Sequence, residues 1–311
     1  MPRRSLLILL AALLCAAALA TVLIAASVTG DRVRAARPLP FEPSEQLVYT
    51  SSFSKLLLRD IDIAELRFTA NRMPTPAAAK EGVGDPAANL LFTGEVDSKG
   101  WFRKLFGIHF HYHFESTVEP DSFASLRAKE LDEQGERQRV SETIFDRLAN
   151  SSTWTERDPK NPARGTRVVT LPQSGAAHDL LSAIYYLRTQ PLAPGGNFEL
   201  FISESGHAYH IPVKVVERKK LSTVLGKVPT LRVDIEMFGD KGLIRGNGQM
   251  SLWLTDDARR IPVRAHISSS MGTLNIALKS AARAAQSNTG SIPSISAFAG
   301  FKEDSTLAFI R

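Results

Sequence analysis

The chain has 311 residues, of which 43% are hydrophobic and 23% charged, a globular composition with enough apolar side chains for a large core. Its net charge of +6 is concentrated in residues 1–37, which hold five arginines and one aspartate, so the remainder is nearly neutral. Since no basic patch is interleaved with aromatic residues, we expect no nucleic-acid partner. A single cysteine, Cys15, excludes an internal disulfide.

The first element is an uncharged apolar run from Leu6 to Ala26, preceded by Arg3-Arg4 and free of Gly and Pro. Its length of roughly 20 residues suits a membrane-spanning helix and exceeds that of a typical signal peptide. Ala18-Leu19-Ala20 nevertheless offers a cleavage site. We therefore expect residues 1–30 to be an anchor in the inner membrane or a cleaved signal peptide, and residues 31–41 to be a linker. Either way, the rest of the chain folds in the periplasm or cell envelope.

Residues 42–280 are expected to form one mainly β domain, because apolar and polar residues alternate along them. The alternation covers about eleven or twelve strands and predicts a strongly curved antiparallel sheet or partial barrel. Its phase slips near Ala64-Glu65, which indicates a β-bulge. It places four side chains on buried faces: Phe110, Val233, Trp253 and Val263.

One stretch has helical spacing instead. Apolar residues between Leu180 and Leu187, Asp179 as N-cap, Arg188 in the last turn and Pro191 beyond predict a short helix over Leu180–Arg188. Residues 100–107 are a weaker helix candidate. Residues 71–88 and 158–165 are expected to be loops, and residues 281–311 a flexible tail.

Several segments resemble the bacterial domain-of-unknown-function family 3108 in that family's order. They are Leu181–Arg188, Trp253–Pro262, Phe41-Glu42-Pro43 with Glu45–Tyr49, and Gly226-Lys227-Val228 before Leu231–Met237. The resemblance covers about Phe41 to Lys279. Ser44 and the Lys55–Asp60 region stand where relatives carry glycines. The resemblance implies an exported, mainly β domain and assigns no catalytic residues.

Three histidines recur at every second position, at His109, His111 and His113. Side chains at such spacing share one face of a strand, and a neighbouring pair could chelate zinc. The third lies about 13 Å from the first, too far to share the same ion, so a catalytic zinc site would need a further ligand from elsewhere in the chain. We favour the interpretation that these histidines form the solvent-facing side of a half-buried strand.

Three aromatic residues are candidates for ligand binding, at a cavity mouth or wall: Tyr185, Tyr186 and Trp253. Packing in the core is the alternative for each of them. Asp256-Asp257 resembles a carboxylate pair but is better explained as a turn.

These observations favour a non-enzymatic cell-envelope protein without a cofactor. We expect its curved sheet, partly closed by the helix, to bind an apolar or amphipathic ligand such as a lipid, or an envelope protein partner. The alternatives are a metal-dependent hydrolase using the three histidines and a purely structural envelope-assembly module.

Overall fold

The computed structural model describes residues 39–73, 88–99, 107, 109–173 and 175–283. All of them belong to a compact unit that begins at Pro38. The predicted anchor or signal, most of the 100–107 helix candidate and the tail beyond Arg283 lie outside the described residues. No helix within the described ranges is long and apolar enough to cross a membrane.

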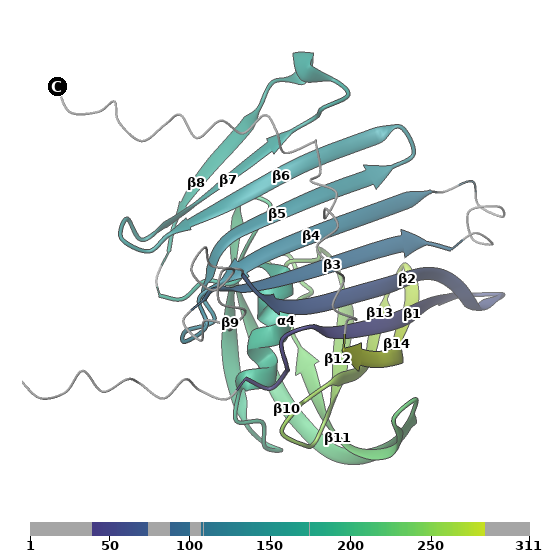
Figure 1. Ribbon diagram of the computed structural model, residues 1–311. Coiled ribbons are helices and arrows are strands. Elements are labelled where there is room, and N and C mark those ends of the chain that lie inside the picture. Colours follow the sequence, from purple (N-terminus) through teal and green to yellow (C-terminus); the bar gives the residue numbers. More distant parts are fainter. Residues whose placement is uncertain (1–38, 74–87, 100–106, 108, 174, 284–311) are drawn as a thin grey trace, which may run out of the picture. The chain divides into compact units, whose positions relative to one another are not determined.

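The described unit is built on one sheet of fourteen strands, in which every neighbouring pair is antiparallel (Figure 1). The sheet order is β8-β7-β6-β5-β4-β3-β2-β1-β14-β13-β12-β11-β10-β9. Bounds are β1 Glu45–Lys55, β2 Leu58–Arg72, β3 Leu90–Ser98, β4 Phe110–Val118, β5 Ser125–Gln134, β6 Arg137–Asp146, β7 Ser151–Arg157, β8 Arg167–Pro172, β9 Asn197–Glu204, β10 His207–Thr223, β11 Gly226–Ile235, β12 Gly248–Thr255, β13 Pro262–Ser269 and β14 Gly272–Arg283.

The predicted fold class is confirmed, but the predicted number of strands is too low. Short outer strands such as β8, most of whose residues are exposed, bury too little for a clear alternation. The predicted bulge is confirmed one residue earlier, because Ser51 and Ser52 pair with Ala64 and Asp62 and leave Ile63 without a partner on β1. The 158–165 loop contains a short 3₁₀ turn, η1, over Pro162–Arg164.

The predicted helix is confirmed as α4, Leu180–Thr189. The Asp179 carboxylate accepts hydrogen bonds from the backbone N–H groups of Leu181 and Ser182 at 2.9 and 3.0 Å, which satisfies two orphan donors of the first turn. Ten residues do not form a stable helix alone in water. Its stability comes from burial, since most of its side chains lie in the core.

The segment Ala177-His178, just before α4, connects distant parts of the sheet. The Ala177 carbonyl accepts from the Ser125 N–H at the start of β5. The next residue, His178, pairs in parallel with Ile202 of β9. The hydroxyls of Ser152 on β7 and Ser203 on β9 also lie 2.9 Å apart. These contacts connect β5 and β7 to β9, which lie far apart in the order of strands in the sheet.

The core consists of three clusters around α4 and β1. The first joins α4 to β9–β13, the second joins α4 to Phe41, β3 and β4, and the third joins β1 to β13 and β14. Val233 and Val263 are buried as predicted. Phe110 and Trp253 are only partly buried, so that prediction is wrong for both. Trp253 pairs across strands with the exposed Arg264 and packs against the edge of the third cluster.

Candidate functional site

A cavity of about 280 Å³ lies between one side of α4 and the inner face of the sheet. The helix contributes Leu180, Ala183, Ile184, Tyr185 and Leu187. The sheet and its loops contribute Leu47, Tyr49, Leu66, Phe68, Leu200, Ile202, Ile211, Ile235, Met237, Leu243, Met250, Leu252, Pro262, Arg264, Ala265 and Ile276. The wall therefore combines strands that precede and strands that follow α4 in the sequence with α4 itself, the only α-helix among the described residues.

The lining is almost wholly hydrocarbon. Its one charged residue, Arg264, is exposed. The Tyr49 hydroxyl donates to the Pro262 carbonyl at 2.9 Å, and burial raises the pKa of Tyr49 far above its usual range, so this phenol stays neutral. An engineered apolar cavity of about half this volume binds benzene, and natural ligand sites begin near 300 Å³. The cavity is thus large enough for an apolar group.

The three predicted ligand-binding residues have different environments. Tyr185 lines the cavity and is fully buried, with its ring stacked on Phe92 at 3.9 Å between centroids. Tyr186 stacks on His178 at 4.2 Å and packs against two core clusters. Trp253 is not part of the lining; it packs against the third core cluster, whereas its neighbour Leu252 lines the cavity. The structure therefore brings Tyr185 to the cavity and separates Trp253 from it.

Two of the three histidines contact carboxylates of β3 and β4 instead of forming a metal-binding cluster. His111 Nδ1 lies 2.8 Å from Asp97 Oδ1 on β3. His113 lies 3.8 Å from Glu95 and 3.4 Å from Glu115, and its hydrogen bonds to Glu115 and Glu95 raise the pKa of His113 to about 9. His109 is exposed just before β4. Within the described ranges, no group of three or more potential ligands could hold a metal ion.

One end of the helix is fixed by a buried ion pair that the sequence did not reveal. The Arg188 guanidinium is fully buried and donates to both carboxylate oxygens of Glu45, at 2.6 and 3.0 Å. It also donates to the carbonyls of Pro40 and Arg259 and lies 5.3 Å from the ring centre of Phe41. The last turn of α4 is thereby connected to both β1 and the β12–β13 turn.

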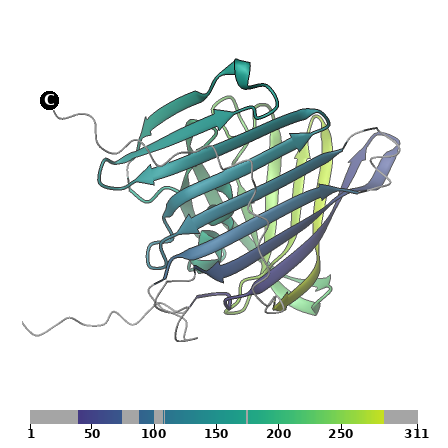
Figure 2. The same ribbon diagram turned by 45° about the horizontal axis from the view of Figure 1, so that its top comes forward.

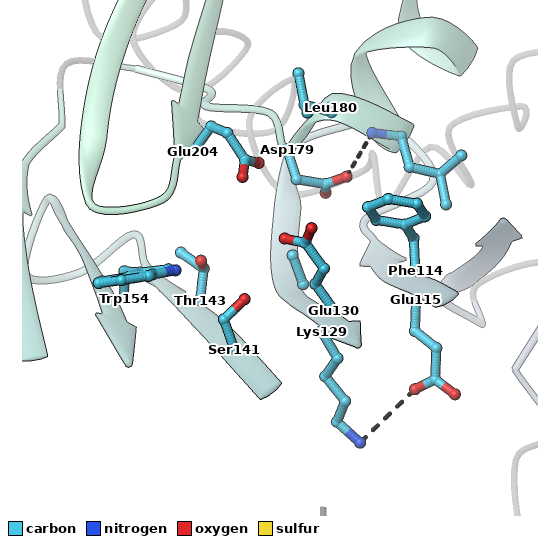
Figure 3. A pocket seen from close by; sticks show the side chains of 12 residues that line it. Phe114, Glu115, Lys129, Glu130, Ser141, Thr143, Trp154, Asp179, Leu180 and Glu204 are labelled. Carbon is cyan, nitrogen blue, oxygen red and sulfur yellow. Dashed lines mark hydrogen bonds and ion pairs between the residues drawn. The ribbon is translucent and has the colours of Figure 1, made fainter. Parts of the chain in front are cut away.

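A second, smaller pocket of about 30 Å³ lies beside the start of α4 and is lined by both polar and apolar side chains (Figure 3). Figure 3 shows the carboxylates of Glu130, Glu204 and Asp179 facing the same space. Burial and the charge of Glu204 raise the pKa of Glu130 to about 8, and burial raises that of Glu204 to about 7. Its volume suits a bound water, and Leu180 lines both this pocket and the apolar cavity.

A curved antiparallel sheet wrapped around a helix, with an apolar cavity between them, defines a mainly β protein with an internal apolar cavity. The chain belongs to the family described as "Protein of unknown function (DUF3108)", which matches residues 74–279. The match confirms the family resemblance, although β1 and β2 both precede it. No curated protein shows significant similarity to the chain.

Solved structures with similar architecture include a "Beta-barrel-like Protein of Domain of Unknown Function DUF1849" from Brucella abortus. It has a TM-score of 0.53 at 8% identity, over 76% of this chain and 96% of that one. This likeness concerns the fold alone. An exported protein with a YmcC-like fold from Bacteroides fragilis has a TM-score of 0.30 at 10% identity, covering 78% and 98%. A lipoprotein from Parabacteroides distasonis has 0.29 at 7%, covering 78% and 97%. Both scores are too low to indicate a shared fold.

Proposed function

We propose that this chain is a non-enzymatic protein of the cell envelope that binds the hydrocarbon chain of a lipid or similar amphiphile between α4 and the sheet. The observation that carries the proposal is the apolar cavity of about 280 Å³. Transfer of hydrocarbon from water into such a space contributes about 0.8 kcal/mol for each methylene group. The lining offers no nucleophile beside a base, which supports binding over catalysis.

The envelope location in this proposal rests on the apolar run from Leu6 to Ala26, which would export the domain and tether it to the inner membrane. A reporter enzyme that is active only outside the cytoplasm should therefore be active when fused to the C-terminus of the full chain. Activity of a cytoplasmic reporter at the same position would contradict this location.

Filling the cavity should abolish ligand binding. Ala265→Phe places a ring in the lining, so photo-crosslinking of the full chain to a diazirine-bearing dodecanoate should fall at least tenfold, measured by intact-mass spectrometry. Ala277→Phe is the matched control, because Ala277 is exposed on β14 and lies outside the lining. Ala183→Leu tests the helix side independently should overpacking destabilise the first variant. Unchanged crosslinking in both cavity variants would contradict the proposal.

Ligand binding should also slow hydrogen exchange in α4. Ala183–Leu187 contributes four lining side chains, so a bound hydrocarbon adds contacts that must break before the helix opens. We expect slower amide exchange at Ala183–Leu187 after dodecanoate is added, with no change in β6, which does not line the cavity. Equal exchange rates with and without dodecanoate would indicate that the helix is simply part of the core, and would favour a structural assembly module.

A further inference from the structure

The β1–β2 hairpin ends in an exposed apolar turn. Leu56 and Leu57 are 90% and 98% exposed, and Leu58 is also exposed. The β13–β14 turn beside it presents Met271, which is 65% exposed. We refer to Leu56, Leu57, Leu58 and Met271 as the tip patch. Single exposed leucines are common on protein surfaces, but three consecutive ones are unfavourable for solubility unless they bind something.

Packing holds the two turns together. β1 pairs with β14 up to Ser54 and Thr273, which places the turns side by side. Gly272 lies so close to Phe53 that a β-carbon there would be 2.6 Å from its ring. The hairpin projects past the neighbouring strands, as Figure 2 shows. The tip patch is therefore a defined surface on a supported hairpin.

The identity of residue 56 has no explanation in folding. Leu56 has a φ of 53°, in the left-handed region that glycine and asparagine prefer in two-residue hairpin turns. A leucine there strains the backbone and buries almost nothing. Both costs would be offset if the side chain entered an apolar phase.

Cations flank the leucines on both sides. Lys55 and Arg59 are exposed, and neither forms an ion pair with a described residue. The nearest carboxylate in sequence is Asp60, whose backbone N–H donates to the Ser54 hydroxyl. The arrangement of apolar side chains between cations matches a bilayer surface, with hydrocarbon below anionic headgroups. A protein partner would need roughly 800 Å² of surface, which four side chains on two narrow turns do not offer.

We propose that the tip patch docks on a membrane surface containing anionic lipids, by inserting Leu56 and Leu57 while Lys55 and Arg59 contact the headgroups. This site is separate from the cavity, whose lining includes none of these residues.

The test uses the full chain with Cys15→Ser, reconstituted in vesicles of phosphatidylcholine with increasing phosphatidylglycerol. Leu57→Cys carries a polarity-sensitive NBD label. Spin-labelled lipid, which quenches the label, is present both in the vesicles that hold the protein and in an added excess of protein-free vesicles. The matched control is Leu148→Cys in the β6–β7 turn, because Leu148 is also 98% exposed but its neighbour Arg147 is paired with Glu119. A third label at Val224→Cys reports on the β10–β11 turn, where Val224 is 55% exposed near Lys219, Lys220 and Lys227.

We expect quenching at position 57, rising with phosphatidylglycerol, and none at position 148. Removing either cation, as Lys55→Gln or Arg59→Gln, should lower the ratio of inserted to free label about fivefold. Equal quenching at positions 57 and 148, quenching at 224 alone, or no quenching at any position would each overturn the proposal. If NBD emission in vesicle-free samples reports a less polar environment as the protein concentration rises, the tip patch associates with itself. That result would also overturn the proposal.

Discussion

Replacing Arg188 with alanine should lower the free energy of unfolding by about 3–5 kcal/mol, because the buried Glu45 carboxylate loses both hydrogen bonds from Arg188 and keeps the more distant Arg259, 3.8 Å away. Glu45 and Arg188 are both buried, and the guanidinium fills its donor positions with two carboxylate oxygens and two backbone carbonyls. The substitution also removes the cation that lies against the rings of Phe41 and Tyr185. Chemical denaturation of the full chain measures the loss.

The control replaces both members of the pair. Arg188→Met with Glu45→Gln removes both charges while keeping most of the volume, and it should recover a large part of the lost stability, since paired removal of buried charges is often close to neutral. Arg167→Ala serves as a surface reference, because Arg167 is exposed and its ion pair with Glu156 is long, at 3.4 Å. It should cost at most about 1 kcal/mol. A loss at Arg188 no larger than that at Arg167 would contradict a structural role for the buried pair.

The features that the sequence predicted well are set by local chemistry. α4 begins at an aspartate whose carboxylate reaches backbone N–H groups two and three residues later, and such a cap is readable from adjacent positions. The bulge at Ile63 is readable because one extra residue reverses the phase of alternation. Arg188 and Glu45 are 143 positions apart, so no local pattern around either residue predicts their ion pair.

The cavity could be predicted only in part, for a similar reason. Leu252, Trp253 and Leu254 are all apolar, so alternation cannot assign their faces. In the structure both leucines are buried, whereas Trp253 is only partly buried. Tyr185 could be assigned to the interior because its helix is amphipathic. The other walls come from strands far apart in the sequence, and only the order of strands in the sheet brings them together.

The pocket beside α4 should make the stability of the protein depend on pH. Glu130 lies on β5 and Glu204 on β9. If both carboxylates were charged, they would repel each other and so push these two strands apart. Burial, together with the charge of Glu204, raises the pKa of Glu130 to about 8, while burial raises that of Glu204 to about 7. In the unfolded chain both carboxyls titrate near 4.3. The folded state therefore binds more protons than the unfolded state between these values, and the free energy of unfolding must fall as pH rises through that window.

We expect the free energy of unfolding to fall by up to about 6 kcal/mol from pH 5 to pH 8 on account of this pair. His113 adds a loss of the same sign as the pH rises from about 6.5 to about 9, so the pair is isolated by comparison with a variant. Glu130→Gln keeps the shape of the side chain but cannot ionise, so it should be the more stable protein at pH 8 and should flatten the profile. Glu136→Gln, at an exposed position in the β5–β6 turn, is the matched control and should leave the slope unchanged. Denaturation midpoints at half-unit pH steps measure both, and equal slopes for wild type and Glu130→Gln would show that the two carboxylates do not oppose each other across the sheet.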